Sequence, residues 1–170
     1  VASRGLGDVY KRQKMNYIID EIDKKILMYL IDNTRIPFTE IAKKMNVSAG
    51  TIHVRVKKLE DAGIIKGSTL VINYEKMGYR FVAYVGILLT KTNKTQHVID
   101  ELYKIPNVTV VHVVSGKYNI FCKIRARDTS HAKEVIYRID QIDDVLRTES
   151  TISLEESFND KNRLLHSIFQ

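Results

Sequence analysis

The stretch Val47-Ser-Ala-Gly-Thr-Ile-His-Val-Arg-Val-Lys-Lys-Leu-Glu-Asp-Ala-Gly-Ile-Ile-Lys-Gly67 decides the fold of the N-terminal part of this 170-residue chain. Ser48 is suited to cap a helix, because its side-chain oxygen accepts a hydrogen bond from a free amide of the first turn. From Ile52 to Leu59, apolar residues recur at spacings of four and three, which predicts a helix with one narrow buried stripe. The other faces of this helix are polar and basic, and Gly63 is placed to end it.

Two further helices are predicted before this stretch. Residues 20–31 carry apolar side chains at helical spacing. Asp20 and Asp23 lie at the start of this segment, where carboxylates satisfy free amides and suit the helix dipole. Pro37 is well placed to begin a second, shorter helix, because its missing amide costs nothing there. Asn46 then tolerates the left-handed conformation that ends a helix.

The segments after the capped helix complete a motif. Residues 64–67 and 68–73 read as short extended segments punctuated by Gly67, which predicts the strands of a wing. A short helix, a tight turn, a basic helix and a wing form a winged helix-turn-helix, whose second helix reads the major groove of DNA. The alternative, a solvated basic helix of an ordinary bundle, is disfavoured by the helix before it and the wing after it.

The outward residues of the basic helix are the predicted DNA contacts. Gly50 lets the backbone come close, Thr51 and Val54 suit thymine methyl groups, and Arg55 suits guanine or phosphate. The full set of predicted DNA-binding residues is Ser48, Gly50, Thr51, His53, Val54, Arg55, Lys57 and Lys58.

The part of the chain beyond residue 80 alternates between strands and helices. Its order is β-α-β-β-α-β, the ferredoxin-like arrangement, so the whole chain is predicted to be α+β. The predicted strands are 81–90, 108–114, 118–127 and 145–154; the helices are 95–104, one that begins at Asp128 or Thr129, and a terminal one within 158–169. Cys122 is predicted to be a buried core residue of the third strand.

Five segments are predicted along the chain. Residues 1–14 lack apolar periodicity, and Asp8-Val-Tyr-Lys-Arg-Gln13 resembles a translated sequencing adaptor, so they are expected to be a non-native leader before a start at Met15. They have no apolar core of the kind that a signal peptide needs. The predicted segments are the leader 1–14, a DNA-binding domain 15–75, a linker 76–80, a ferredoxin-like domain 81–156 and a tail or helix 157–170.

Composition excludes several classes of protein. The formal net charge is +7, but the leader supplies four basic residues against one aspartate, which leaves +4 for the rest. No apolar run reaches the roughly 18 residues of a membrane span. One cysteine allows neither an internal disulfide nor a cysteine-based zinc site, and it fits a reducing cytoplasm. The five histidines show no metal-ligand spacing, and no catalytic cluster is visible, so we expect no enzyme, no metal and no cofactor.

Segments in both halves of the chain share the pattern of one family. They are Asp20-Glu-Ile-Asp-Lys-Lys-Ile-Leu27, Arg35-Ile36, Glu40-Ile-Ala-Lys-Lys44, Gly50-Thr-Ile-His-Val-Arg-Val56 and Ile152-Ser-Leu154. The chain thereby resembles the Lrp/AsnC (feast/famine) transcriptional regulators, and within them the asparagine-responsive AsnC branch. The resemblance covers residues 17–155. It implies that the ferredoxin-like half binds an effector and pairs through its sheet into dimers, which assemble into octamers or filaments.

The resemblance also implies a site for a small amino acid, most plausibly asparagine, at the turn Ser115-Gly-Lys-Tyr-Asn-Ile120. Amides beside a glycine can bind a carboxylate, and the neighbouring side chains offer polar groups. Lys117 departs from the family, which often has an acidic residue there. A plain hairpin turn is the alternative. The predicted effector-binding residues are Ser115, Gly116, Lys117, Tyr118, Asn119, Thr148 and Ser150.

The predicted function is that of a sequence-specific DNA-binding transcriptional regulator in the cytoplasm, modulated by an amino acid. Its predicted partners are double-stranded DNA, the amino acid and further copies of the chain. Two alternatives stay open: an architectural DNA-binding protein that needs no ligand, and a regulatory subunit of an enzyme.

Overall fold

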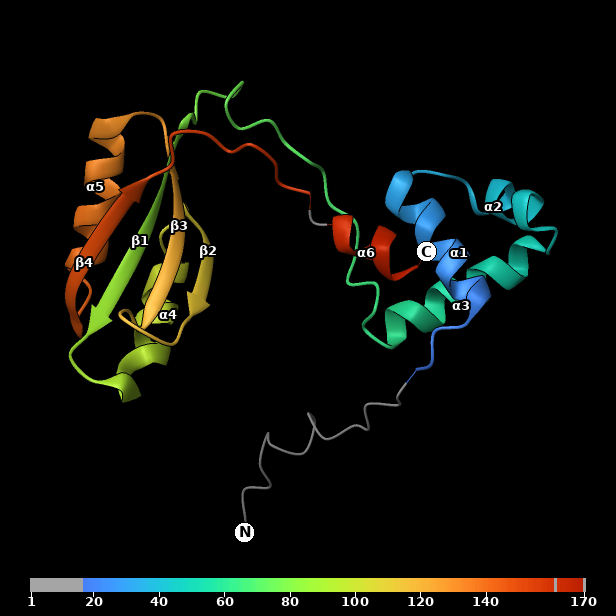
Figure 1. The fold of residues 1–170 in the computed structure, drawn as a ribbon, viewed down its shortest axis with the longest axis horizontal. Coiled ribbons are helices and arrows are strands. Elements are labelled where there is room, and N and C mark those ends of the chain that lie inside the picture. Colours follow the sequence, from blue (N-terminus) through green and yellow to red (C-terminus); the bar gives the residue numbers. More distant parts are fainter. Residues whose placement is uncertain (1–16, 161, 170) are drawn as a thin grey trace, which may run out of the picture. The chain divides into compact units, whose positions relative to one another are not determined.

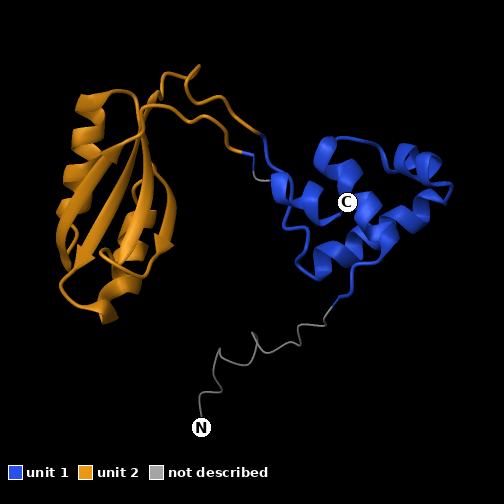
Figure 2. Cartoon of the chain, in the orientation of Figure 1, with its two compact units in different colours: residues 1–70, 160–170 blue, residues 71–159 orange. Residues whose placement is uncertain are grey.

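The computed structural model describes residues 17–160 and 162–169, so the predicted leader 1–14 lies outside the described residues. The chain divides into two compact units (Figure 2). The described part of the first unit runs from residue 17 to Leu70 and includes the C-terminal residues from Asp160. The second unit is Val71–Asn159. In the described part of the chain, no helix is long and apolar enough to cross a membrane.

The first unit contains four helices within the described residues (Figure 1). They are α1 (Glu21–Asp32), α2 (Phe38–Met45), α3 (Ala49–Asp61) and the C-terminal α6 (Arg163–Ile168). The apolar stripes of the first three helices meet in one core, because each helix is apolar on one face only. The buried residues of this core are Ile26, Ile36, Ile41, Ala42, Ile52 and Val56.

The ends of the helices follow the predicted capping residues. Asp20 is the N-cap of α1, and together with Asp23 it forms a capping box. Asn46 ends α2 in the left-handed conformation, with φ 54°. The Ser48 side chain accepts a hydrogen bond from the Thr51 amide at 3.1 Å and so caps α3. Gly63, with φ +71°, follows the end of α3.

The predicted strands of the wing are not formed, and this corrects the expectation for residues 64–67 and 68–73. No residue between 64 and 73 belongs to a strand. The amides of Ile64 and Ile65 donate to the Leu59 carbonyl and thus complete the end of α3. The segment from 68 to 73 is exposed throughout. An extended segment becomes a strand only when a second segment accepts its hydrogen bonds, and in the described chain residues 68–73 have no such partner.

The second unit is a four-stranded antiparallel sheet with helices (Figure 1). Its elements are β1 (Phe81–Leu89), a short 3-10 helix η1 (Thr92–Lys94), α4 (Thr95–Tyr103), β2 (Val108–Val113), β3 (Ile120–Ala126), α5 (Thr129–Asp140) and β4 (Val145–Ile152). The strand order is β2-β3-β1-β4, and every neighbouring pair is antiparallel. The prediction of an α+β chain with a ferredoxin-like second half is therefore confirmed.

The two faces of the sheet have different surroundings. Along β3, Ile120, Cys122 and Ile124 are buried in a core with residues of α4 and α5, as the prediction for Cys122 required. The residues between them, including Phe121 and Lys123, lie on the opposite face, because successive side chains of a strand alternate. We call this opposite face the open face of the sheet.

Candidate nucleic-acid interface and effector turn

The outer face of α3 is the candidate surface for DNA. Gly50, Val54, Lys57 and Lys58 are exposed, and the apolar residue Val54 is 52% exposed. In the major groove of DNA, an exposed valine can contact a thymine methyl group while neighbouring lysines contact phosphates. Within the described residues, neither Lys57 nor Lys58 forms an ion pair with a carboxylate.

Three of the other predicted DNA-binding residues contact the protein itself. The Ser48 hydroxyl accepts the Thr51 amide and lies 2.8 Å from the Thr51 hydroxyl. The His53 ring packs against Phe38 of α2, with 6.0 Å between the ring centroids. Ser48 and His53 nevertheless stay exposed, whereas Thr51 is half-buried. Capping and packing thus fix the start of α3 against α2.

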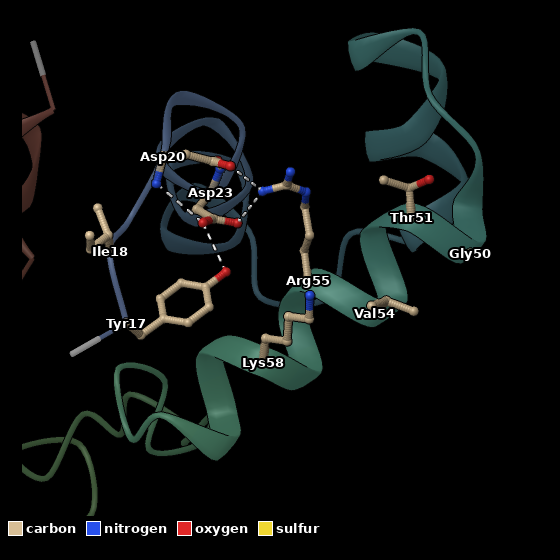
Figure 3. Close-up of a pocket in the computed structure, with 9 residues that line it drawn as sticks. All are labelled: Tyr17, Ile18, Asp20, Asp23, Gly50, Thr51, Val54, Arg55 and Lys58. Carbon is tan, nitrogen blue, oxygen red and sulfur yellow. Dashed lines mark hydrogen bonds and ion pairs between the residues drawn. The ribbon is translucent and has the colours of Figure 1, made fainter. Parts of the chain in front are cut away.

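Arg55 lies at the edge of this face and is held by two carboxylates. Figure 3 shows its side chain reaching from α3 to the first turn of α1. Its Nη1 atom donates to Asp20 Oδ2 at 2.7 Å and to Asp23 Oδ1 at 2.9 Å. Asp23 is 1% exposed, and its other oxygen accepts the Tyr17 hydroxyl at 2.9 Å. The hydrogen bonds to Asp20 and then Asp23 raise the pKa of Arg55.

The acidic side of this cluster was not predicted as part of the interface. Asp20, Asp23 and Tyr17 line one hollow together with Gly50, Val54 and other residues of α3 (Figure 3). In the sequence, helix capping alone explains Asp20 and Asp23, so nothing there indicates a contact with α3. The only signal in the sequence was the long cationic side chain of Arg55 in the predicted recognition helix, which can reach a neighbouring helix.

The candidate effector turn connects β2 and β3. Gly116 has φ +120°, a backbone conformation that side chains other than glycine rarely adopt. Within the described residues, the backbone amides of Ser115, Gly116 and Lys117 donate no hydrogen bond. Free amides beside a glycine are suited to hold a carboxylate.

Tyr118 turns its ring onto the open face of the sheet, above Gly86 of β1. A Cβ atom added at Gly86 would lie 2.7 Å from three ring carbons of Tyr118. Glu149 of β4 is the neighbour of Gly86 in the sheet. Its carboxylate accepts the Tyr118 hydroxyl at 2.7 Å and forms ion pairs with Lys117 and Arg147. The hydrogen bonds from Lys117 and then Tyr118 lower the pKa of Glu149.

The structure does not bring all the predicted effector-binding residues together. The Asn119 side chain accepts the Leu89 amide at 2.9 Å and thereby holds the turn against β1. Thr148 donates to Asp140 of α5 at 2.7 Å. Ser150 lines a separate hollow beside α5. Thr148 and Ser150 flank Glu149 in β4, and alternation directs them to the sheet face opposite Tyr118.

Two residues of the turn site were missed from the sequence. Gly86 interrupts an apolar run in a central strand, and such a glycine often marks a close approach of another group. That signal was available. Glu149 was not identifiable, because its place beside Tyr118 depends on the register of β1 with β4. Thr148 and Ser150, the two predicted residues of β4, are the sequence neighbours of Glu149 and lie on the other face of the sheet.

Comparison with known proteins agrees with both units. Residues 19–66 match the family described as winged helix-turn-helix DNA-binding, and residues 82–162 match the Lrp/AsnC ligand binding domain. An uncharacterized HTH-type transcriptional regulator of Pyrococcus furiosus is 38% identical over 81% of this chain and 92% of its own length. Regulatory protein AsnC of Escherichia coli is 36% identical over 82% of this chain and 93% of its own.

Solved structures extend the comparison to the fold. The structure of E. coli AsnC superposes with a TM-score of 0.80 at 34% identity, and covers 84% of this chain and 97% of its own. A feast or famine regulatory protein from M. tuberculosis, complexed with L-methionine, has a TM-score of 0.78 at 26% identity, over 85% of this chain and 97% of its own.

The fold and the two matched regions define a class: a DNA-binding regulator in which helix-turn-helix and ligand-binding domains share one chain. The chain belongs to the Lrp/AsnC family of transcriptional regulators, and its second half matches the ligand binding domain of that family. It is a regulator and not an enzyme.

Proposed function

We propose that the chain is a sequence-specific transcriptional regulator that places α3 in the major groove and responds to asparagine. The cytoplasm is its proposed location. The observation that supports the first part is the outer face of α3, where an exposed valine lies beside exposed lysines that have no carboxylate partner among the residues the structure describes. Lysines of this kind bind phosphates, and the valine contacts the edges of bases.

The chemistry of the effector turn suits an amino acid. A free amino acid carries a carboxylate and an ammonium group on the same carbon. Lys117, Arg147 and Glu149 together carry a net positive charge, which with the amides around Gly116 suits the carboxylate. Asparagine is favoured over other amino acids by the similarity to AsnC of E. coli and of Haemophilus influenzae.

Assembly is the second part of the proposal. Two copies pair through the open faces of their sheets, and these dimers assemble further. A dimer presents two α3 helices to successive major grooves of a nearly palindromic site. Asparagine then acts by stabilising one assembly over another, and the effect is limited by the difference between its affinities for the two.

Calorimetric titration with a panel of amino acids tests the effector. We expect asparagine to bind, with glutamine, aspartate, leucine and methionine weaker or silent. Tyr118→Ala is expected to weaken the binding, because it removes one partner of Glu149. Tyr103→Ala is the matched control, because Tyr103 is exposed on α4.

The outcomes separate the alternatives. A different amino acid that binds best would overturn asparagine and keep the site. If no amino acid binds, and none changes the size of the assembly or its affinity for DNA, the architectural alternative takes the place of the proposal.

A further inference from the structure

We propose that Arg55 is a positioning residue that ties the recognition helix α3 to the N-terminus of α1, and that it supplies no positive charge to DNA. The inference rests on the proposed function, since it concerns how α3 meets DNA. It differs from the expectation, drawn from the sequence, that Arg55 contacts guanine or phosphate.

The first argument is the charge of the cluster. The single positive charge of Arg55 lies 2.7 Å from one carboxylate oxygen and 2.9 Å from another, on Asp20 and Asp23. One cation and two carboxylates together carry a net negative charge. A phosphate that approached Arg55 would therefore meet a site that repels it, whereas at Lys57 and Lys58 it meets cations that no carboxylate of the described residues neutralises.

The second argument is burial. Asp23 is 1% exposed and the Arg55 side chain is 25% exposed. Within the described part of the chain, a guanidinium that turned outward to DNA would leave this buried carboxylate with two neutral donors, the Tyr17 hydroxyl and the Asp20 amide. Removing the charged partner of a buried carboxylate is strongly unfavourable. The ion pairs of Arg55 with Asp20 and Asp23 are therefore favoured over a contact with a solvated phosphate.

The third argument is connection. Arg55 is separated from Asp20 and Asp23 by 35 and 32 residues in sequence, so the contacts join two different helices. The apolar contacts of α1 and α3 bring the helices together but are not directional. The guanidinium bonds to both ends of the first turn of α1 at fixed geometry, and so set the rotation of α3 about its own axis. That rotation decides whether Val54 and Lys58 face the groove.

The salt dependence of DNA binding distinguishes a positioning cation from a DNA-contacting one. Each phosphate that a cation neutralises contributes about 0.9 to the slope of log K against log salt. The probe is a duplex that the wild-type chain selects from a random-sequence library. Arg55→Gln is compared with Lys58→Gln, which removes one charge from the same helix.

We expect Arg55→Gln to weaken binding by about two- to fivefold, the range of a partly exposed ion pair, with an unchanged slope. Its thermal midpoint, followed by circular dichroism, should fall by roughly 5 °C or more. Lys58→Gln should reduce the slope by about 0.9 and leave the midpoint unchanged. A slope reduced by a similar amount in Arg55→Gln would overturn the proposal, whatever the midpoint does.

Asp20→Asn keeps the test decisive if Arg55→Gln does not fold. Asparagine caps a helix as well as aspartate does, so the exchange removes one of the two ion pairs of Arg55, keeps the pair with Asp23 and keeps the cap. The proposal predicts a lower thermal midpoint and an unchanged salt slope. A steeper slope would mean that Arg55 leaves Asp23 for a phosphate, which contradicts the proposal. If Lys58→Gln also left the slope unchanged, the placement of α3 on DNA would fail, and with it the proposed function.

Discussion

At the scale of single residues, Gly86 makes the clearest prediction. Gly86→Ala places a methyl group 2.7 Å from the Tyr118 ring, so the ring must leave its place above β1. We expect a loss of about 1–3 kcal/mol in the free energy of unfolding, as for other overpacked sites. Asparagine binding should weaken as well, because the displaced Tyr118 no longer meets Glu149. Denaturant unfolding and calorimetry measure the two effects.

Gly50→Ala is the matched control for stability. A Cβ atom at Gly50 would lie 3.7 Å from the Ser48 hydroxyl, which is an ordinary contact. If Gly86→Ala were as harmless to folding as Gly50→Ala, the close packing of Tyr118 on β1 would be refuted.

The pH dependence of stability tests the Asp20–Arg55 pair. Hydrogen bonds from the Asp23 amide and then from Arg55 hold the pKa of Asp20 below its ordinary value. A carboxyl whose pKa is lowered on folding stabilises the protein above its unfolded pKa, and this contribution is lost as the pH falls through the folded value. We therefore expect wild type to be more stable than Asp20→Asn at about pH 6, and the difference to shrink at about pH 3. Thermal unfolding across this range measures it, and a difference that grew toward acid pH would have the wrong sign.

At the scale of elements, α3 is open to a test that separates folding from recognition. Gly50 lies on the exposed outer face of this helix. Gly50→Ala should stabilise the helix by up to about 0.5–1 kcal/mol, because alanine is the better helix former. Its methyl group should nevertheless weaken binding to the selected duplex, if the backbone at this point approaches DNA closely. Unfolding and DNA titration of the same variant measure both. Unchanged DNA affinity would place the contact elsewhere on α3.

The elements also show how far the sequence predicts the structure. The ends of α2 and α3 were predictable, because Asn46, Ser48 and Gly63 act on their own neighbours. Whether residues 64–73 form the strands of a wing was not predictable, because an extended segment needs a partner that composition does not reveal. The same limit applies to the sites. The turn at Gly116 is a local signal, whereas Glu149 meets it only through the register of two strands.

At the scale of the whole molecule, the two units are linked in function if asparagine changes the affinity for DNA. Linkage makes this coupling reciprocal: the factor by which asparagine changes DNA affinity equals the factor by which DNA changes asparagine affinity. If the two units worked independently, asparagine would leave the affinity for DNA unchanged, and DNA would leave the affinity for asparagine unchanged.

The most direct test is therefore the affinity for the selected duplex, measured without asparagine and with a saturating concentration of it. We predict a change of roughly fivefold or more, absent in Gly86→Ala, whose effector turn is disturbed. A duplex affinity that neither asparagine nor any other amino acid alters would contradict the account of an amino-acid-responsive regulator.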